Sequence, residues 1–154
     1  MKAIHWIIAA AALVFVQPAQ AAQTDPEVII YRFPGVRDDG GAVFAGTATV
    51  FHCTNFSGVD EIIRWVTRDS AGGLLDNTFF GISHLRTITV GTHINRAYST
   101  VTLSTGVINQ GTTAIAATST NIICTAMTID ASTTAPIGVA LRGIRFSPVP
   151  GSQE

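Results

Sequence analysis

Short runs of alternating apolar and polar residues recur along the chain and are separated by turn-forming residues. Alternation with a period of two is typical of half-buried β-strands, and clusters of Gly, Pro, Asp and Asn are typical of the turns between them. The pattern therefore predicts strands over residues 27–33, 45–55, 61–68, 74–82, 84–90, 98–103, 113–129 and 137–146. We expect a break near Ala117 in the longest of these runs, and turns over residues 34–41 and 69–73, where glycines accept a positive φ.

The same alternation assigns side chains to faces. Phe51 and Cys53 share a face of the second predicted strand, and His52 points the other way. In the third strand Trp65 lies opposite Arg64, which we expect to face solvent, so Trp65 should point inward. The predicted core consists of Phe51, Cys53, Ile63, Trp65, Ile122, Cys124, Val139 and Leu141.

The N-terminus has the pattern of an export signal. An apolar run over residues 6–16 follows Lys2 and ends at Gln17 and Pro18, before the small-residue pattern that closes at Ala21. The run is too short to span a bilayer, so it predicts a signal peptide over residues 1–21 and one domain over residues 22–154. We expect the mature protein in the bacterial periplasm or outside the cell, with no membrane span.

Composition and charge change this picture in three ways. Thr, Val and Ile are abundant while charged residues make up 12% of the chain, which favours an all-β fold. Lys2 is the only lysine and lies in the predicted signal, so the mature chain has none for a Walker-type phosphate loop or a Schiff base. The net charge of −1 and the lack of a basic run exclude nucleic acid as the expected partner.

Two cysteines in predicted strands of an exported chain favour a disulfide between Cys53 and Cys124. With Trp65 between them, they resemble the Cys…Trp…Cys pattern of immunoglobulin-like sandwiches, although Ile122 stands where that family usually has tyrosine. The resemblance implies an all-β, two-sheet antiparallel immunoglobulin-like sandwich, with one inter-sheet disulfide and the tryptophan packed against it. Phe51 and Trp65 are then structural core residues.

Candidate chemistry is sparse. His52, His84 and His93 are weak candidates for a zinc or copper site, because no His-x-His pair places two imidazoles on one face. The sequence predicts no metal site, no cofactor and no catalytic residue. The acidic pairs at 38–39 and 60–61 fit turn chemistry and a strand start, with a calcium site at either loop as an open alternative.

What remains for function is the surface. A hydroxyl-rich stretch over residues 112–120 has no lysine and no other charged residue that would discourage pairing at a sheet edge. An edge strand without such residues can pair with another chain. We therefore expect a non-catalytic binding or assembly module that contacts a protein or a glycan, with oligomers through edge strands as a further option. The alternative is an exported metal-assisted or hydrolytic enzyme that uses His84 and His93.

Overall fold

A computed structural model describes residues 23–146, and the predicted signal peptide over residues 1–21 lies outside them. The strands are β1 (Val28–Asp38), β2 (Thr47–Asn55), β3 (Glu61–Asp69), β4 (Leu74–Ile82), β5 (Thr87–Gly91), β6 (Val101–Thr102), β7 (Ile108–Ala117), β8 (Ile122–Asp130), β9 (Gly138–Leu141) and β10 (Ile144–Arg145). None of the described residues lies in a helix, so the all-β prediction is confirmed.

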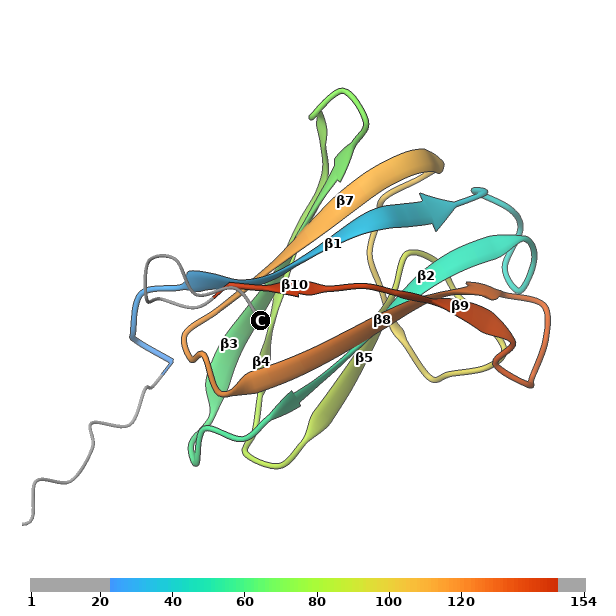
Figure 1. The fold of residues 1–154 in the computed structure, drawn as a ribbon. Coiled ribbons are helices and arrows are strands. Elements are labelled where there is room, and N and C mark those ends of the chain that lie inside the picture. The colour runs from blue at the N-terminus through green and yellow to red at the C-terminus, as the bar shows by residue number, and fades with distance from the viewer. Residues whose placement is uncertain (1–22, 147–154) are drawn as a thin grey trace, which may run out of the picture.

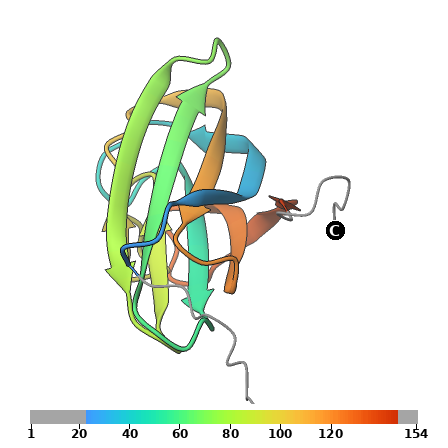
Figure 2. The same ribbon diagram turned by 90° about the vertical axis from the view of Figure 1, so that its left-hand side faces the viewer.

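The strands form two facing sheets (Figure 1). Sheet A has the order β10-β1-β7-β3-β4, and sheet B has the order β6-β5-β2-β8-β9. Neighbouring strands are antiparallel except for the short β5–β6 pair. Figure 2 shows β4 as the outermost strand of its sheet, beside β3 and then β7.

No helix in the described part of the chain is long and apolar enough to cross a membrane.

The core lies between the two sheets, because most of the inward residues of the long strands are apolar. Trp65 from sheet A and Phe51 from sheet B are both fully buried and belong to one apolar cluster. Of the predicted core, Val139 is wrong, since its side chain is 72% exposed. Val139 lies in β9, which is the last strand of sheet B, and no further strand of the described residues lies beside it on its outer side.

The predicted disulfide between Cys53 and Cys124 is present, but the prediction that it joins the two sheets is wrong. Strands β2 and β8 are hydrogen-bonded neighbours in sheet B, and the two cysteines stand directly opposite each other. Their Cα atoms are 4.2 Å apart, close to the spacing of opposite residues in an antiparallel pair. In the immunoglobulin order the two cysteine strands lie in opposite sheets, so the structure shares the two-sheet sandwich and the disulfide, but not its placement.

Two of the predicted runs each form two strands. The run predicted over 113–129 divides at residues 118–121, next to the break expected near Ala117, and there the chain passes from β7 in sheet A to β8 in sheet B. The run predicted over 137–146 divides between β9 and β10, which also lie in different sheets. Gly143 lies at this second crossing, where an added Cβ would stand 2.4 Å from the ring of Phe33, so only glycine fits.

Other strand boundaries in the structure differ from the predicted ones by a few residues. Strand β1 continues through the expected turn to Asp38, with irregular register near Pro34 and Val36. His84 was predicted in a strand and lies in the turn before β5, and the run predicted over 98–103 contains only the two residues of β6. The predicted bounds of β4 match the structure.

Candidate functional site

The hydroxyl-rich stretch over residues 112–120 is not at an edge. Strand β7 lies in the middle of sheet A, between β1 and β3, and Thr113, Thr118 and Ser119 are buried. The Thr113 hydroxyl bonds that of Thr67 at 2.8 Å, and the Thr118 hydroxyl bonds the carboxylate of the buried Glu61. These hydroxyls serve internal hydrogen bonding, so the free edges of the molecule have to be sought elsewhere.

The long free edge is that of β4. It has β3 on one side and, within residues 23–146, no strand on the other, whereas the other edge strands have two or four residues. Its sequence has one charged residue, Asp76, and contains neither proline nor lysine, the residues that commonly protect an edge from pairing. The Asp76 carboxylate accepts a hydrogen bond from the backbone N–H of Ser104, which lies in the segment before β7.

The hydrogen-bond pattern shows which backbone groups of β4 are free. The N–H of Thr118 donates to the carbonyl of Ile62, so the backbone of Ile62 faces β7. Because backbone groups alternate in direction along an antiparallel strand, those of Trp65 face β4 and pair with Thr78. The residues of β4 whose N–H and C=O point away from β3 are therefore Asn77, Phe79 and Gly81. No described residue makes a backbone hydrogen bond to these groups.

Side chains beside this edge are held in place by one arginine. The Arg64 guanidinium donates to both carboxylate oxygens of Glu27, at 2.6 and 2.9 Å, and to the side-chain oxygen of Asn77 at 3.1 Å. It also lies 4.7 Å from the centre of the Phe79 ring, whose side chain is 55% exposed. The hydrogen bond from Arg64 lowers the pKa of Glu27, so this pair is ionised near neutral pH. The outer face of β4 thus presents a positioned aromatic ring next to its free backbone.

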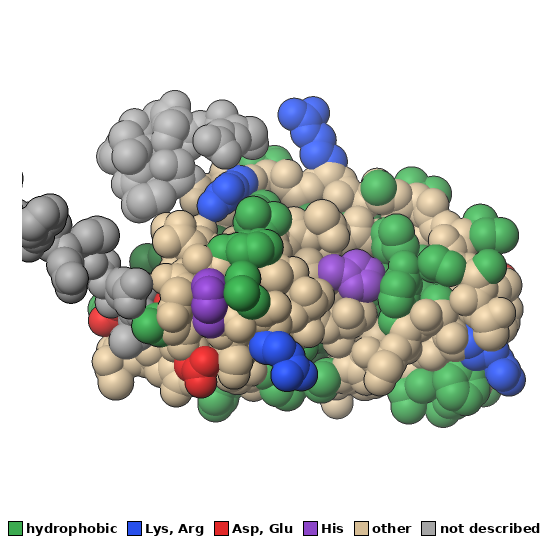
Figure 3. All heavy atoms as spheres, turned by 90° about the horizontal axis from the view of Figure 1, so that it is seen from below, with side chains coloured by type: hydrophobic (Ala, Val, Ile, Leu, Met, Phe, Trp, Pro, Cys, Tyr) green, Lys and Arg blue, Asp and Glu red, His purple; other side chains and the backbone are tan. Residues whose placement is uncertain are grey.

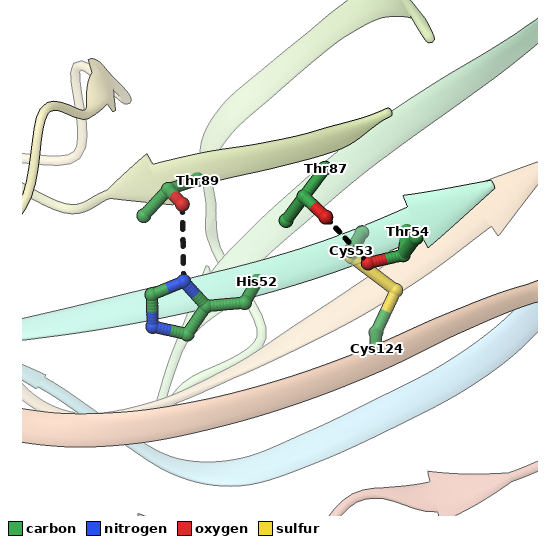
Figure 4. The surroundings of a disulfide bond; sticks show 6 residues. All are labelled: His52, Cys53, Thr54, Thr87, Thr89 and Cys124. Carbon is green, nitrogen blue, oxygen red and sulfur yellow. Dashed lines mark hydrogen bonds between the residues drawn. A yellow bond between two sulfur atoms is a disulfide. The ribbon is translucent and has the colours of Figure 1, made fainter. Parts of the chain in front are cut away.

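The three candidate histidines lie in three separate places. Nδ1 of His52 is 3.0 Å from the Thr89 hydroxyl on the outer face of sheet B (Figure 4), and burial lowers the pKa of this imidazole. His84 accepts a hydrogen bond from the N–H of Gly58 at 3.0 Å. The histidine side chains visible in Figure 3 lie apart from each other on that face.

His93 is bound by an acid and a carbonyl. Its Nδ1 is 2.8 Å from the carboxylate of Asp38, and its Nε2 is 2.9 Å from the backbone oxygen of Ala45. The contacts tie the end of β1 to the segment after β5 and to the loop before β2. Among the described residues no group of three or more His, Cys, Asp or Glu side chains could hold a metal ion. The structure therefore does not bring His84 and His93 into one cluster.

The disulfide lies next to hydrogen-bonded threonines. Figure 4 shows Cys53 between His52 and Thr54, whose hydroxyl is 2.7 Å from that of Thr87. Cys53 is fully buried and Cys124 nearly so, and both point into the core. We interpret the disulfide as structural, because no ionisable side chain is hydrogen-bonded to either sulfur in the described part of the chain.

Comparisons with protein-family models, with curated proteins and with solved structures find no match to this chain. What can be stated of its class comes from the fold itself: a two-sheet all-β sandwich with a disulfide within one sheet and with β4 as a long edge strand.

Proposed function

We propose that this protein is an exported, non-catalytic binding module that takes up an extended segment of another protein along the free edge of β4. The single observation that carries the proposal is the outward backbone of Asn77, Phe79 and Gly81 on a nine-residue edge strand, to which no residue of the described range 23–146 makes a backbone hydrogen bond. An extended segment laid against it would gain main-chain hydrogen bonds, as in other cases of strand addition.

The side chains favour a protein segment over a glycan. Phe79 stands beside the free backbone and can pair with an apolar or aromatic residue on an added strand, which contributes roughly 0.2–1 kcal/mol per cross-strand pair. Backbone pairing supplies affinity, and alternate side chains supply specificity. The proposal gives His84 and His93 no role in catalysis, because they bind separate partners at separate places.

Export is part of the same proposal. The signal-type N-terminus supports it, and so does the disulfide, because such bonds persist mainly in oxidising compartments. The mass of the protein recovered from the exported fraction tests this step: we expect a chain that begins at Ala22 and lacks the two thiol hydrogens. A protein that retains residues 1–21 or carries two free thiols would contradict it.

The binding step is tested with peptides selected from a library of extended segments. Bound peptides should slow amide hydrogen exchange at Asn77, Phe79 and Gly81, whose N–H groups they would engage. Substitution Asn77→Pro removes one outward N–H while leaving the bonds to β3, and should weaken binding at least tenfold, since each 1.4 kcal/mol is a factor of ten.

The matched control is Asn77→Ala, which removes the same side chain and keeps the N–H. It should bind nearly as well as the unaltered protein. Equal binding by the two variants, protection of amides outside β4, or a failure to select any peptide would each overturn the proposal.

A further inference from the structure

A pocket lies on the outer face of sheet A, at its centre and away from the β4 edge. It has a volume of about 140 Å³ and a floor made by Thr112, Ala114 and Ala116, whose side chains point outward from β7. Its walls rise from the two neighbouring strands, with Ile29 on β1 and Val66 on β3. Although Ala114 and Ala116 face outward, they are only 7% and 8% exposed, so the walls enclose them.

Two arginines flank this pocket on opposite sides. Arg32 on β1 is in register with Ala114, and Arg68 on β3 is in register with Thr112. Neither guanidinium has a carboxylate partner among the described residues. Arg68 uses one N–H to bind the carbonyl of Gly72 at 2.9 Å, and Arg32 lies 5.5 Å from the ring of Phe146. A guanidinium has five N–H donors, so both retain several for a ligand.

The Thr112 hydroxyl adds a further polar group at the floor. It makes no hydrogen bond to any other described residue and can donate or accept. Acids are scarce nearby: Glu27, on the same face, is already paired with Arg64. The pocket therefore combines two uncompensated positive charges and one free hydroxyl with walls of Ile, Val and Ala.

We propose that this pocket binds a small organic carboxylate, with the carboxylate held by Arg32 and Arg68 and a short apolar chain packed on Ala114 and Ala116. Planar guanidinium groups match the geometry of a carboxylate and can bind it through two parallel hydrogen bonds. The volume equals that of about five water molecules at roughly 30 Å³ each, which suits a chain of a few carbons.

The lining favours this ligand over others of similar charge. Inorganic phosphate would leave the apolar walls without a partner. A sugar ring would find no aromatic side chain to stack on, because the walls and floor are aliphatic, hydroxyl or arginine groups. The inference goes beyond the proposed strand binding and does not depend on it, since neither Arg32 nor Arg68 lies on β4.

Butanoate is the probe, and NMR of the protein over residues 22–154 is the measurement. We expect chemical-shift changes centred on Ile29, Val66, Ala114 and Ala116, with a dissociation constant on the order of 1 mM for so few atoms. Butanol and butylammonium, which have the same chain without the negative charge, should produce at most a tenth of the affinity. Inorganic phosphate should also bind more weakly, because it lacks the chain.

Substitutions separate a built pocket from general attraction of anions. Arg32→Gln and Arg68→Gln should each weaken butanoate binding by about tenfold, as expected when a charged hydrogen bond is lost. Both side chains are exposed, so the variants should remain folded. Arg86→Gln removes the same charge from an exposed arginine outside the pocket, and should leave the affinity unchanged.

Ala114→Val reduces the space on the floor and should reduce binding without loss of fold. Equal weakening by Arg86→Gln, equal binding of butylammonium, or shifts that spread over both sheets would overturn the proposal. So would the absence of binding at concentrations well above the expected constant.

Discussion

The outer faces of both sheets carry small apolar residues, but another segment of the described chain packs over them only on sheet B. On sheet B, Ala48 and Val50 point away from the main core and are nevertheless fully buried. They form a second apolar cluster with Ile129, because Ala97 and Tyr98 pack over them. On sheet A, Ala114 and Ala116 also point outward, yet no segment of the described chain fills the pocket above them.

Short outward side chains leave a depression in the face of a sheet, which another side chain can fill. Tyr98 fills the depression on sheet B: its ring contacts His52, with centroids 4.6 Å apart, and its hydroxyl lies 3.7 Å from the sulfur of Met127. Sheet B is also stapled by its disulfide. On sheet A the equivalent space is bordered by Arg32 and Arg68, and no aromatic side chain lines it.

The largest expected effect on stability comes from the disulfide in sheet B. Replacing both Cys53 and Cys124 by alanine should lower the free energy of unfolding by about 4 kcal/mol, because the unfolded chain regains the entropy of an open loop of 71 residues. Urea denaturation of the variant and of the unaltered protein measures this difference. A loss below about 1 kcal/mol would mean that the hydrogen bonds between β2 and β8 hold sheet B without help.

The next effect compares the two faces directly. Tyr98→Ala uncovers the second cluster on sheet B and should cost about 2 kcal/mol, less than the 3–5 typical of a fully buried aromatic residue. Val66→Ala, in the uncovered pocket wall of sheet A, should cost less than about 1 kcal/mol. Tyr98→Phe serves as the control, since it keeps the ring. Equal costs for Tyr98→Ala and Val66→Ala in urea denaturation would remove the distinction between the faces.

The smallest effect is a difference in pH dependence. Burial lowers the pKa of His52 in the folded protein, so the unfolded state binds a proton first. The stability should therefore fall as the pH drops below about 6.5, until the lowered folded pKa is passed. On sheet A, Arg64 lowers the pKa of Glu27, so the stability from this pair is present above about pH 4.5 and is lost at lower pH.

Each contribution should be below about 1 kcal/mol, because both groups are partly exposed to solvent. Urea denaturation from pH 7.5 down to about pH 3 separates them. His52→Gln should flatten the profile in the upper part of this range, and Glu27→Gln in the lower part. If His52→Gln left the upper slope unchanged, the imidazole would not be the group that responds there.

Much of the fold could be predicted because alternation is a local property. It placed Phe51, Cys53 and Trp65 inward and His52 outward, and the structure agrees in each case. The limits of β4 were predicted correctly because a glycine turn precedes it and Ser83 and His84 follow its last apolar residue. Val50 shows the limit of this reasoning: its outward direction follows from the pattern, but its burial depends on Tyr98, forty-eight residues further along the chain.

The candidate sites were less accessible. The free edge was expected in the threonine-rich stretch and lies in β4, because strand order depends on which strands meet and not on their composition. The pocket on sheet A could not be predicted either, since Arg32 and Arg68 are brought to it only by the pairing of β1 and β3 with β7. Alternation along each strand could have shown that these arginines and the alanines of β7 point outward, but not that the three strands lie side by side.

By itself, then, the sequence determined the all-β class, the inward faces of the strands and the pairing of two cysteines, because side-chain alternation and the presence of only two thiols are written along the chain. Tertiary structure alone decided that the disulfide lies within sheet B, that β4 is an edge strand, and that, among residues 23–146, Tyr98 covers the small residues on the outer face of sheet B while the pocket on sheet A stays open. Each of these depends on contacts between segments far apart in sequence, and register between strands leaves no local signal.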